Sequence, residues 1–380
     1  MPTQRDMLIG FDATPLEVRH RSGVSRYATE LLSALIARND GRRYALLSSR
    51  ALNGHTPAGA YAYNRVHFPN RSFWMQAVLP LELRQMGPQL CHFTNMIAPI
   101  FAPCPFVLTI HDLTLLLHPQ TQPTKSLLGV KPMVVPAIRK AAAIIAVSHS
   151  VKQEIVQLLD VDAKRVHVVY EAASPSYRVI TDQAELARVR GAYDLHKPFI
   201  LFVGTVEPRK NLGRLLEAFA QLRHAGHTEQ LVMVGQLGWK YGAIVQQIEE
   251  LNQRSPDMRD SVRLIGYVAD DDLPAIYNLA AVVALPSLYE GFGLPILESM
   301  ACGTPVLTSN ISSMAEVGAD AVVLVDPFDP ANIADGLRRL LTNADLRQTL
   351  RTAGLARARE FSWARAGLET INVYEQVLNA

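Results

Sequence analysis

Residues 285–306, LPSLYEGFGLPILESMACGTPV, contain the signals for a strand end, a glycine turn, a helix and the next strand in immediate succession. The uniformly apolar run Val282–Leu285 leads into this stretch, and two glycines form the turn. The helix that follows should end at Gly303, and a second apolar strand is expected at Pro305–Thr308. Apolar strands that are separated by a helix are typical of parallel sheets covered on both faces.

The same alternation of strand and helix extends over the whole chain. Further apolar runs predict strands at Leu8–Phe11, Tyr44–Ser48, Leu90–Phe93, Val107–Ile110, Ala143–Val147, Val166–Val169, Phe199–Val203, Gln230–Val234, Val262–Leu264 and Ala321–Val325. One predicted helical face follows Asn211, a candidate N-cap, and consists of Leu212, Leu215, Leu216, Phe219 and Leu222. A second consists of Val24, Tyr27, Leu31, Leu32 and Leu35. This order predicts doubly wound α/β layers.

The length of 380 residues suits about two domains. The segment Glu171–Pro198 interrupts the alternation with two prolines, a helical stretch and a fresh strand. We therefore predict an N-terminal Rossmann-like domain at 1–175, a C-terminal one at 176–362 and a final amphipathic helix at 363–380. Two parallel-sheet domains of similar size create a cleft, and such sheets bind ligands at the carboxyl ends of their strands.

The composition excludes several classes of protein. Apolar residues make up 49% and charged residues 19%, which permits large cores and argues against disorder. Three cysteines without a CxxC pair indicate neither a zinc site nor a disulfide framework, and this suits a reducing cytoplasm. The first apolar run stops at Asp12 and is too short for a signal peptide, and no stretch approaches the roughly 18 apolar residues of a membrane span. We expect a cytoplasmic protein that is soluble or peripherally attached to a membrane.

The net charge of +2 is unevenly distributed. Residues 1–175 carry 18 Lys and Arg against 11 Asp and Glu, a balance of +7, whereas residues 176–380 carry 19 against 24, a balance of −5. The first half is thus the better candidate for an anionic surface or acceptor, although an ordinary solvated surface explains the balance equally well. Nucleic acid is not an expected partner, because no dense stripe of Lys and Arg with interleaved aromatic residues occurs.

Glu290 and Glu298 flank the sequence GFGLP at the strand-to-helix turn. Eight positions along a helix correspond to roughly 12 Å, so the two carboxylates are expected to bind the two ends of one extended ligand, such as a sugar and a ribose. The glycines let backbone N–H groups approach that ligand, and a helix N-terminus favours negative charge. Taken singly, Glu290 would be interpreted as a turn residue and Glu298 as a charge on a helix surface. The two together, on either side of GFGLP, indicate a binding site.

The spacing of these glutamates resembles the E-x7-E motif of the large retaining glycosyltransferase family 4, which has the GT-B fold. The likeness extends over LPSLYEGFGLPILESMACGTPVLTSNISSMAEV, residues 285–317. The resemblance implies that Glu298 binds the donor ribose hydroxyls and that Glu290 contacts the transferred sugar. It also implies that the sugar and diphosphate lie along the backbone of Gly291, Phe292, Gly293 and Leu294. In this fold the last helix crosses back to pack on the first domain.

A second motif, FVGTVEPRKN at residues 202–211, follows the first strand of the second domain. Arg209 and Lys210 at the start of a helix can offset the charge that grows on a diphosphate leaving group without a metal ion. A capped, solvated loop is the ordinary alternative. Beside the glutamate motif the pair resembles the family's diphosphate-binding Arg/Lys pair. Many members place a further arginine after the strand glycine, where this chain has Thr205, so the number of phosphate contacts stays open.

His111 and Gly23 are the candidate site residues of the first domain. His111 ends a predicted strand, and in the resembling family a histidine here faces the donor sugar through its main chain or its ring. Asp112 is expected either to orient the imidazole or to cap the following turn. Gly23, within RHRSGVSRY at residues 19–27, would allow close approach of the acceptor or diphosphate, with Arg19, Arg21 and Arg26 adding charge.

Two further features of the sequence give weaker indications of function. Tyr267 and Val268 end another second-domain strand, and in relatives this loop lies against the nucleotide base. Two apolar segments with interleaved cations, 73–83 and 113–140, fit either core packing or a bilayer interface.

The resemblance implies a retaining, metal-independent hexosyltransferase with His111, Arg209, Lys210 and Glu290 as catalytic residues. No DxD pair lies at a suitable strand end, and no GxGxxG fingerprint for a nicotinamide or flavin enzyme occurs, so no cofactor is expected. The sequences of these motifs are most similar to those of the mannosyltransferase branch that builds bacterial surface polysaccharides. It implies GDP-mannose as donor and a glycan or lipid-linked glycan as acceptor. UDP- or dTDP-sugar donors, an epimerase and a sugar-nucleotide sensor are the alternatives.

Overall fold

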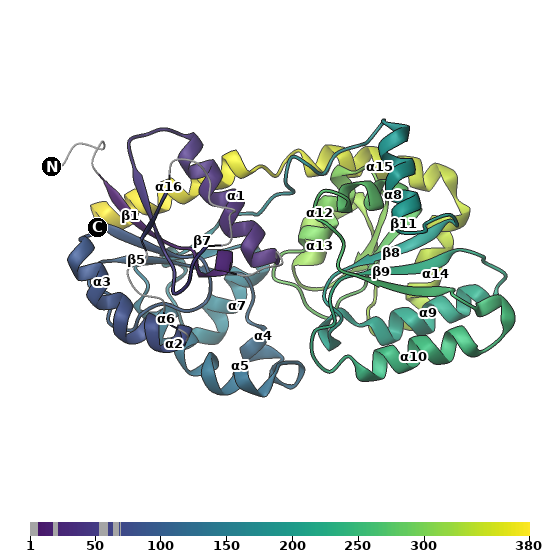
Figure 1. Ribbon diagram of the computed structural model, residues 1–380, viewed down its shortest axis with the longest axis horizontal. Coiled ribbons are helices and arrows are strands. Elements are labelled where there is room, and N and C mark those ends of the chain that lie inside the picture. Colours follow the sequence, from purple (N-terminus) through teal and green to yellow (C-terminus); the bar gives the residue numbers. More distant parts are fainter. Residues whose placement is uncertain (1–6, 18–21, 53–59, 64–67, 69) are drawn as a thin grey trace. The chain divides into compact units, whose positions relative to one another are not determined.

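The computed structural model describes residues 7–17, 22–52, 60–63, 68 and 70–380 (Figure 1). The chain divides into two compact units. Unit 1 consists of Met1–Glu171 and Ser362–Ala380, and unit 2 consists of Ala172–Phe361. The first unit is therefore discontinuous in sequence, because the last helix returns to it.

Unit 1 is built on a seven-stranded parallel sheet with the order β3-β2-β1-β4-β5-β6-β7 among the described residues. The strands are β1 (Leu8–Asp12), β2 (Arg43–Leu47), β3 (Tyr61–Tyr63), β4 (Leu90–Phe93), β5 (Phe106–Ile110), β6 (Ala143–Ala146) and β7 (Val166–Val168). Six of them were predicted from apolar runs. The sequence analysis missed β3, because the residues around it, 53–65, contain no Val, Ile, Leu, Met or Phe and form no apolar run.

Helices cover both faces of this sheet, with α1 and α16 on one side and α3 and α6 on the other (Figure 1). The longer helices are α1 (Gly23–Ala37), α3 (Leu79–Met86), α6 (Lys131–Lys140), α7 (His149–Leu159) and α16 (Trp363–Asn379). The shorter ones are η2 (Thr14–Glu17), α2 (Arg71–Phe73), η3 (Trp74–Val78), α4 (Thr114–Leu117), η4 (Pro119–Thr121), α5 (Thr124–Gly129) and η5 (Ala163–Arg165). α16 packs on α1, and Ser362 caps its first turn by accepting a hydrogen bond from Arg365 N at 3.2 Å.

A buried chain of hydrogen bonds connects α16 to the sheet. The Tyr374 hydroxyl lies 2.7 Å from Nδ1 of His92 on β4, and Nε2 of His92 lies 2.8 Å from Oγ1 of Thr109 on β5. Thr109 Oγ1 in turn lies 2.8 Å from the hydroxyl of Tyr27 on α1. Burial lowers the pKa of His92 to about 3, so this imidazole is neutral at physiological pH. This chain of hydrogen bonds stabilises one docking position for α16, since any shift would leave buried polar atoms unpaired.

Unit 2 is built on a six-stranded parallel sheet with the order β10-β9-β8-β11-β12-β13. The strands are β8 (Phe199–Val203), β9 (Gln230–Val234), β10 (Val262–Gly266), β11 (Val282–Leu285), β12 (Val306–Ser309) and β13 (Val323–Val325). The strand order reverses between β8 and β11. In doubly wound sheets the loops at this switch point form the ligand site.

Helices again cover both faces, with α9 and α10 on one side and α8 and α12 on the other (Figure 1). The elements are α8 (Gln183–Ala192), η6 (Pro208–Lys210), α9 (Leu212–His224), α10 (Gly242–Gln253), η7 (Pro256–Met258), α11 (Leu273–Leu279), α12 (Leu294–Ala301), α13 (Ser312–Gly318), η8 (Ala319–Ala321), α14 (Pro330–Thr342) and α15 (Ala344–Ala358). The apolar face predicted for α9 is fully buried. α12 ends where it was expected to end, because Gly303 adopts a left-handed φ of 73°.

Candidate active site

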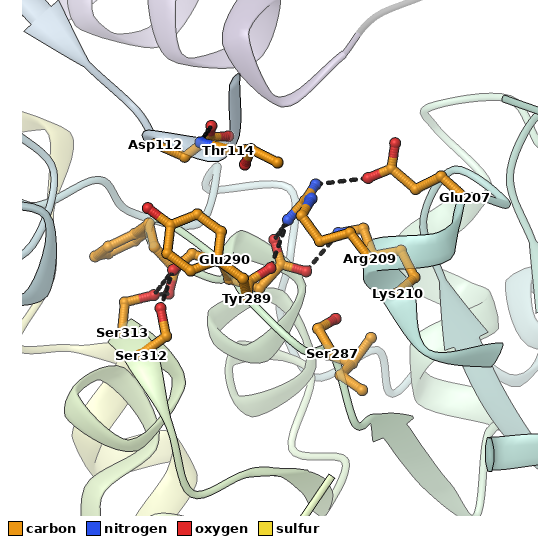
Figure 2. Close-up of polar contacts among 12 residues, drawn as sticks. Asp112, Thr114, Glu207, Arg209, Lys210, Ser287, Tyr289, Glu290, Ser312 and Ser313 are labelled. Carbon is orange, nitrogen blue, oxygen red and sulfur yellow. Dashed lines mark hydrogen bonds and ion pairs between the residues drawn. The ribbon is translucent and has the colours of Figure 1, made fainter. Parts of the chain in front are cut away.

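The loops that follow β8 and β11 bring Arg209, Lys210 and Glu290 together (Figure 2). The two strands are neighbours in the sheet, so their carboxyl ends lie at one edge although the residues are about 80 positions apart. Nη1 of Arg209 donates to Oε2 of Glu290 at 2.6 Å, and Nζ of Lys210 donates to Oε1 at 2.6 Å. Both oxygens of one carboxylate are thus engaged by two different cations.

A second carboxylate, Glu207, holds the other side of the Arg209 guanidinium through a bond of 2.7 Å from Nη2 to Oε1. Burial on its own would raise the pKa of Glu290, but Arg209 and Lys210 hold that pKa at about 2. Burial also raises the pKa of Glu207, against the opposing effect of Arg209 and Lys210. Glu290 is therefore ionised throughout the neutral range, and the centre is a compact cluster of charges that largely offset one another.

Backbone contacts fix the two loops to each other. The N–H of Leu288 donates to the carbonyl oxygen of Arg209 at 2.9 Å, and Nη1 of Arg209 donates to the carbonyl oxygen of Tyr289 at 2.7 Å. Asn211 is 4% exposed, and its amide donates to the carbonyl oxygens of Pro286 at 2.9 Å and Pro327 at 2.7 Å. The cations are consequently presented by a loop with little freedom to move.

Asn211 does precede a helix, as expected, but its side chain does not cap that helix. Its φ of 59° is left-handed, whereas a capping residue needs an extended backbone to direct its oxygen at the first turn. The side chain is instead used to tie three loops together. The prediction was right about the position and wrong about the role.

Two serines of α13 form hydrogen bonds to the backbone of the glycine turn between Glu290 and α12. Oγ of Ser312 and Oγ of Ser313 donate to the carbonyl oxygen of Glu290 at 2.5 and 2.8 Å (Figure 2), and Ser313 also donates to the carbonyl oxygen of Phe292 at 2.9 Å. Gly293 has a left-handed φ of 108° and directly precedes α12, whose N-terminal residue is Leu294. The turn is not helical, so the separation of roughly 12 Å expected for eight helical positions does not apply to Glu290 and Glu298.

The remaining residues of this motif are mostly buried. Glu298, which is 2% exposed, lies on α12, and its Oε2 accepts a hydrogen bond of 2.8 Å from the hydroxyl of Tyr277 on α11. Gly291 is buried, and the ring of Phe292 packs edge-on against Phe361 at 6.0 Å between centroids. Phe292 therefore contributes its backbone to the turn and its side chain to the core.

Thr205, Tyr267 and Val268 follow β8 and β10 on the same edge of the sheet. The loops after β8 and β9 pass so closely that a Cβ atom on Gly235 would lie 1.9 Å from the carbonyl oxygen of Gly204. Gly235 N in turn donates to Gly266 O at 2.8 Å, directly before Tyr267. Tyr267 is 43% exposed and Val268 is buried.

His111 lies in unit 1, at the carboxyl end of β5, and both of its ring nitrogens are engaged within that unit. Nε2 donates to the carbonyl oxygen of Thr94 at 2.9 Å, and Nδ1 lies 2.8 Å from Oε1 of Glu171. Burial would lower the pKa of His111, but Glu171 and Thr94 together raise it above its ordinary value. Because a carbonyl and a carboxylate only accept, this arrangement favours the doubly protonated ring.

Asp112 does not orient the imidazole. Its Oδ1 accepts a hydrogen bond of 2.8 Å from Thr114 N, so it takes the second of the two roles considered, the cap of the following turn. The imidazole is instead positioned by Glu171 and by the ring of Tyr27, whose centroid lies 4.6 Å away at 87°.

Gly23 is exposed at the first turn of α1, and a Cβ atom added there would meet nothing within 4 Å. Arg19 and Arg21 lie outside the described residues. In the apolar segments 73–83 and 113–140, Trp74 and Met75 are fully buried, whereas Phe73, Leu81 and Leu128 are exposed by 54, 56 and 75%. Within the described ranges, no helix is long and apolar enough to cross a membrane, and no group of three potential metal-binding His, Cys, Asp or Glu side chains occurs.

Sequence reasoning missed Glu171, Glu207, Tyr277, Ser312 and Ser313. Each contacts a predicted site residue, but each is a single polar residue with no periodic pattern around it. Glu207 had a usable signal, because it lies within the VEPRKN motif two positions before Arg209, and Ser312 and Ser313 lie within residues 285–317, the segment that resembles the family. The others become recognisable only when the strands are placed side by side.

Comparisons with known proteins identify the family of this chain. A family model described as glycosyl transferases group 1 matches residues 184–357, and one described as glycosyltransferase family 4 matches residues 21–176. The O-antigen chain mannosyltransferase B of Escherichia coli is 32% identical over 341 residues, which are 89% of this chain and 84% of that protein. The serotype-specific mannosyltransferase WbdA of Escherichia coli is 33% identical over 245 residues, 63% of this chain and 29% of that longer protein.

Among solved structures, Anabaena Alr3699/HepE in complex with UDP and glucose superposes with a TM-score of 0.76 at 20% identity, over 97% of this chain and 100% of that one. A likeness at this identity shows the fold, which is GT-B. The family follows from the closer relative, since the 32% identity to the O-antigen mannosyltransferase extends over 84% of its length. The chain therefore belongs to glycosyltransferase family 4.

Proposed function

We propose that this glycosyltransferase transfers mannose from GDP-mannose to a glycan or lipid-linked glycan during assembly of a bacterial surface polysaccharide. Two relatives that are 32% and 33% identical are named as mannosyltransferases, one of an O-antigen chain and one serotype-specific, and this supports the sugar and the type of product. The donor base and the acceptor follow from the resemblance of the motifs.

The observation that carries the proposal is the convergence of Arg209 and Lys210 on one anionic group, each at 2.6 Å. Donors at this separation suit two oxygens of a diphosphate as well as two oxygens of a carboxylate. The charge on the diphosphate increases as the glycosidic bond breaks, so fixed cations here stabilise the transition state more than the ground state. In this mechanism Arg209 and Lys210 supply the positive charge at the leaving group.

The other site residues take complementary roles in the proposal. Glu298 binds the ribose, and Glu290 binds a hydroxyl of the sugar while positive charge develops at the anomeric carbon. Both ring nitrogens of His111 are engaged by Thr94 and Glu171, so His111 meets the sugar through its main chain. We further propose retention at the anomeric carbon, with a donor phosphate oxygen accepting the proton of the acceptor hydroxyl.

Unit 1 is the proposed acceptor side. Residues 1–171 carry 18 Lys and Arg against 11 Asp and Glu, and residues 362–380 carry 1 against 2, so the unit has a balance of +6, which favours an anionic or lipid-linked acceptor. Phe101 is exposed, and Nζ of Lys140 lies 4.6 Å from the centre of its ring, so an apolar and a cationic group lie together on this unit. Such a pair suits a peripheral contact with an anionic membrane surface.

The first test is a thermal-shift screen against GDP, UDP, ADP, dTDP and their common sugar conjugates. A ligand at 100 times its dissociation constant adds about 2.7 kcal/mol of stability. Selective stabilisation by GDP and GDP-mannose is expected, followed by release of GDP only when a mannosylated glycan is present. Stabilisation by another nucleotide would refute the donor, and isomerisation of a nucleotide sugar without acceptor would indicate an epimerase instead.

A further inference from the structure

The Glu290 carboxylate engages the same two cations that the proposed function assigns to the diphosphate. Its two oxygens accept from Arg209 and Lys210 at 2.6 Å each. A carboxylate and a phosphate compete for such donors because both offer anionic oxygens to them. Glu290 therefore has two incompatible tasks, one with the cations and one with the transferred sugar.

We propose that Glu290 is an internal stand-in for the donor diphosphate. The diphosphate takes over Arg209 and Lys210, the carboxylate is released, and Glu290 becomes available to a sugar hydroxyl only while the diphosphate is bound. This inference rests on the proposed function and adds a coupling between recognition of the leaving group and recognition of the sugar.

The surrounding contacts permit this exchange by side-chain rotation alone. The carbonyl oxygen of Glu290 stays anchored by Ser312 and Ser313, so the backbone need not move. Arg209 keeps its bond of 2.7 Å to Glu207, so the guanidinium remains in place when Glu290 leaves. The two cations thus stay in place, and the Glu290 carboxylate is the group that moves.

The charges determine the direction of the exchange. A diphosphate carries more than one negative charge, so it interacts with a pair of cations more strongly than a single carboxylate does. Glu290 has a pKa of about 2, held there by Arg209 and Lys210 against the effect of burial, so protonation does not release it near pH 7. An anion of higher charge can release Glu290 from the two cations. After transfer, the returning carboxylate competes with the product diphosphate and speeds its release.

The test is the variant Glu290→Gln, which keeps the size of the side chain and removes its charge. Isothermal titration measures the dissociation constants of GDP, GDP-mannose and guanosine for the variant and the wild type. UDP, UDP-glucose and uridine take their place if the thermal screen selects uridine. The matched control is Glu229→Gln, which removes the same charge from unit 2 directly before β9, at the amino end of the strands.

The variant should bind GDP about tenfold more tightly than the wild type, because the internal competitor is gone. Guanosine should bind both proteins equally, and the control should match the wild type. GDP-mannose should lose the advantage over GDP that it has in the wild type, because the sugar contact is lost. Unchanged or weaker binding of GDP by Glu290→Gln would overturn the exchange.

Two further outcomes keep the conclusions separate. A wild type that binds no nucleoside diphosphate would overturn the proposed function itself, whereas normal binding without tightening in the variant overturns only the exchange. If Glu290→Gln does not fold, Glu290→Asp retains the charge but is one methylene too short to reach both cations. GDP should then bind more tightly than in the wild type by a smaller factor, and equal affinity would count against the exchange.

Discussion

The pair of His111 and Glu171 should make the stability of unit 1 depend on pH. Both groups are nearly buried, with side chains 12% and 5% exposed, and Nδ1 lies 2.8 Å from Oε1. In Glu171→Gln the charge-assisted bond is replaced by a neutral one. Hydrogen bonds to charged groups contribute about 1.5–3 kcal/mol and neutral ones about 0.5–1.5 kcal/mol, so this variant should lose the difference, roughly 1–1.5 kcal/mol of unfolding free energy, at pH 6. Glu171→Ala should lose more, up to about 3 kcal/mol, because Nδ1 of the buried His111 ring is then left without a hydrogen-bond partner.

The direction of the pH dependence follows from the raised pKa of His111. A group whose pKa is higher in the folded than in the unfolded protein contributes stability that is fully present below its unfolded value of about 6.5. That contribution is lost as the pH rises through the folded-state pKa. The difference in stability between the wild type and Glu171→Gln should therefore be largest near pH 6 and should shrink towards pH 9.

The assay needs a signal from unit 1 alone. The chain has three tryptophans, of which Trp74 and Trp363 belong to unit 1 and Trp239 to unit 2. In a Trp239→Phe background, tryptophan fluorescence during urea unfolding reports on unit 1. Glu30→Gln on α1 serves as the control for removal of a carboxylate. A difference that stays flat from pH 6 to pH 9, or that remains below about 0.5 kcal/mol at pH 6, would refute the charged pair.

Three further predictions concern unit 2. Glu298→Ala should chiefly weaken donor binding, while Lys210→Ala should lower turnover more than binding; steady-state kinetics with donor titrations separate the two, and equal small effects would contradict these roles. Asn211→Gly keeps the left-handed backbone but loses two hydrogen bonds to buried carbonyl oxygens. Calorimetry should therefore show a melting temperature of unit 2 that is lower by roughly 4–12 °C. A shift below about 1 °C would contradict the role of this side chain in holding the loops together. Gly336→Ala should cost about 1–3 kcal/mol, because the added Cβ would lie 2.6 Å from Leu307 Cδ1; a neutral or stabilising effect in urea unfolding would show that α14 can shift away from the sheet.

The strands could be predicted well because strands buried on both faces are uniformly apolar. β8, β9 and β11 occur at the predicted residues, since each is a short apolar run between polar turns. β3 could not be found, because residues 53–65 contain no Val, Ile, Leu, Met or Phe and so form no apolar run, whereas the equally short β7 and β13 lie in runs of valine. Local composition thus indicates a strand wherever an apolar run marks it, at a sheet edge as in β7 and β10 as well as in the middle, and fails where no such run occurs.

The sequence could place the candidate residues at strand ends, but it could not predict their contacts. The motifs place Arg209, Lys210 and Glu290 at strand ends, yet nothing in the sequence shows that the carboxylate lies on the cations rather than apart from them. The same limit applies to His111: the sequence offered Asp112 either as a partner of the imidazole or as a cap of the following turn, whereas the partner is Glu171, 60 residues away in the sequence. Pairing across strands depends on register and on loop geometry, which motif spacing does not encode.

The return of α16 to unit 1 has a consequence for the order of events during synthesis. The ribosome makes residues 1–171 first, but the helix that covers α1 emerges only after all of unit 2. At about 5–20 residues per second, the first unit waits roughly 10–40 s with that face of α1 uncovered and with His92 lacking Tyr374. The domain that is translated first is therefore completed last, and during this interval its uncovered apolar surface is the part of the nascent chain that a chaperone would bind.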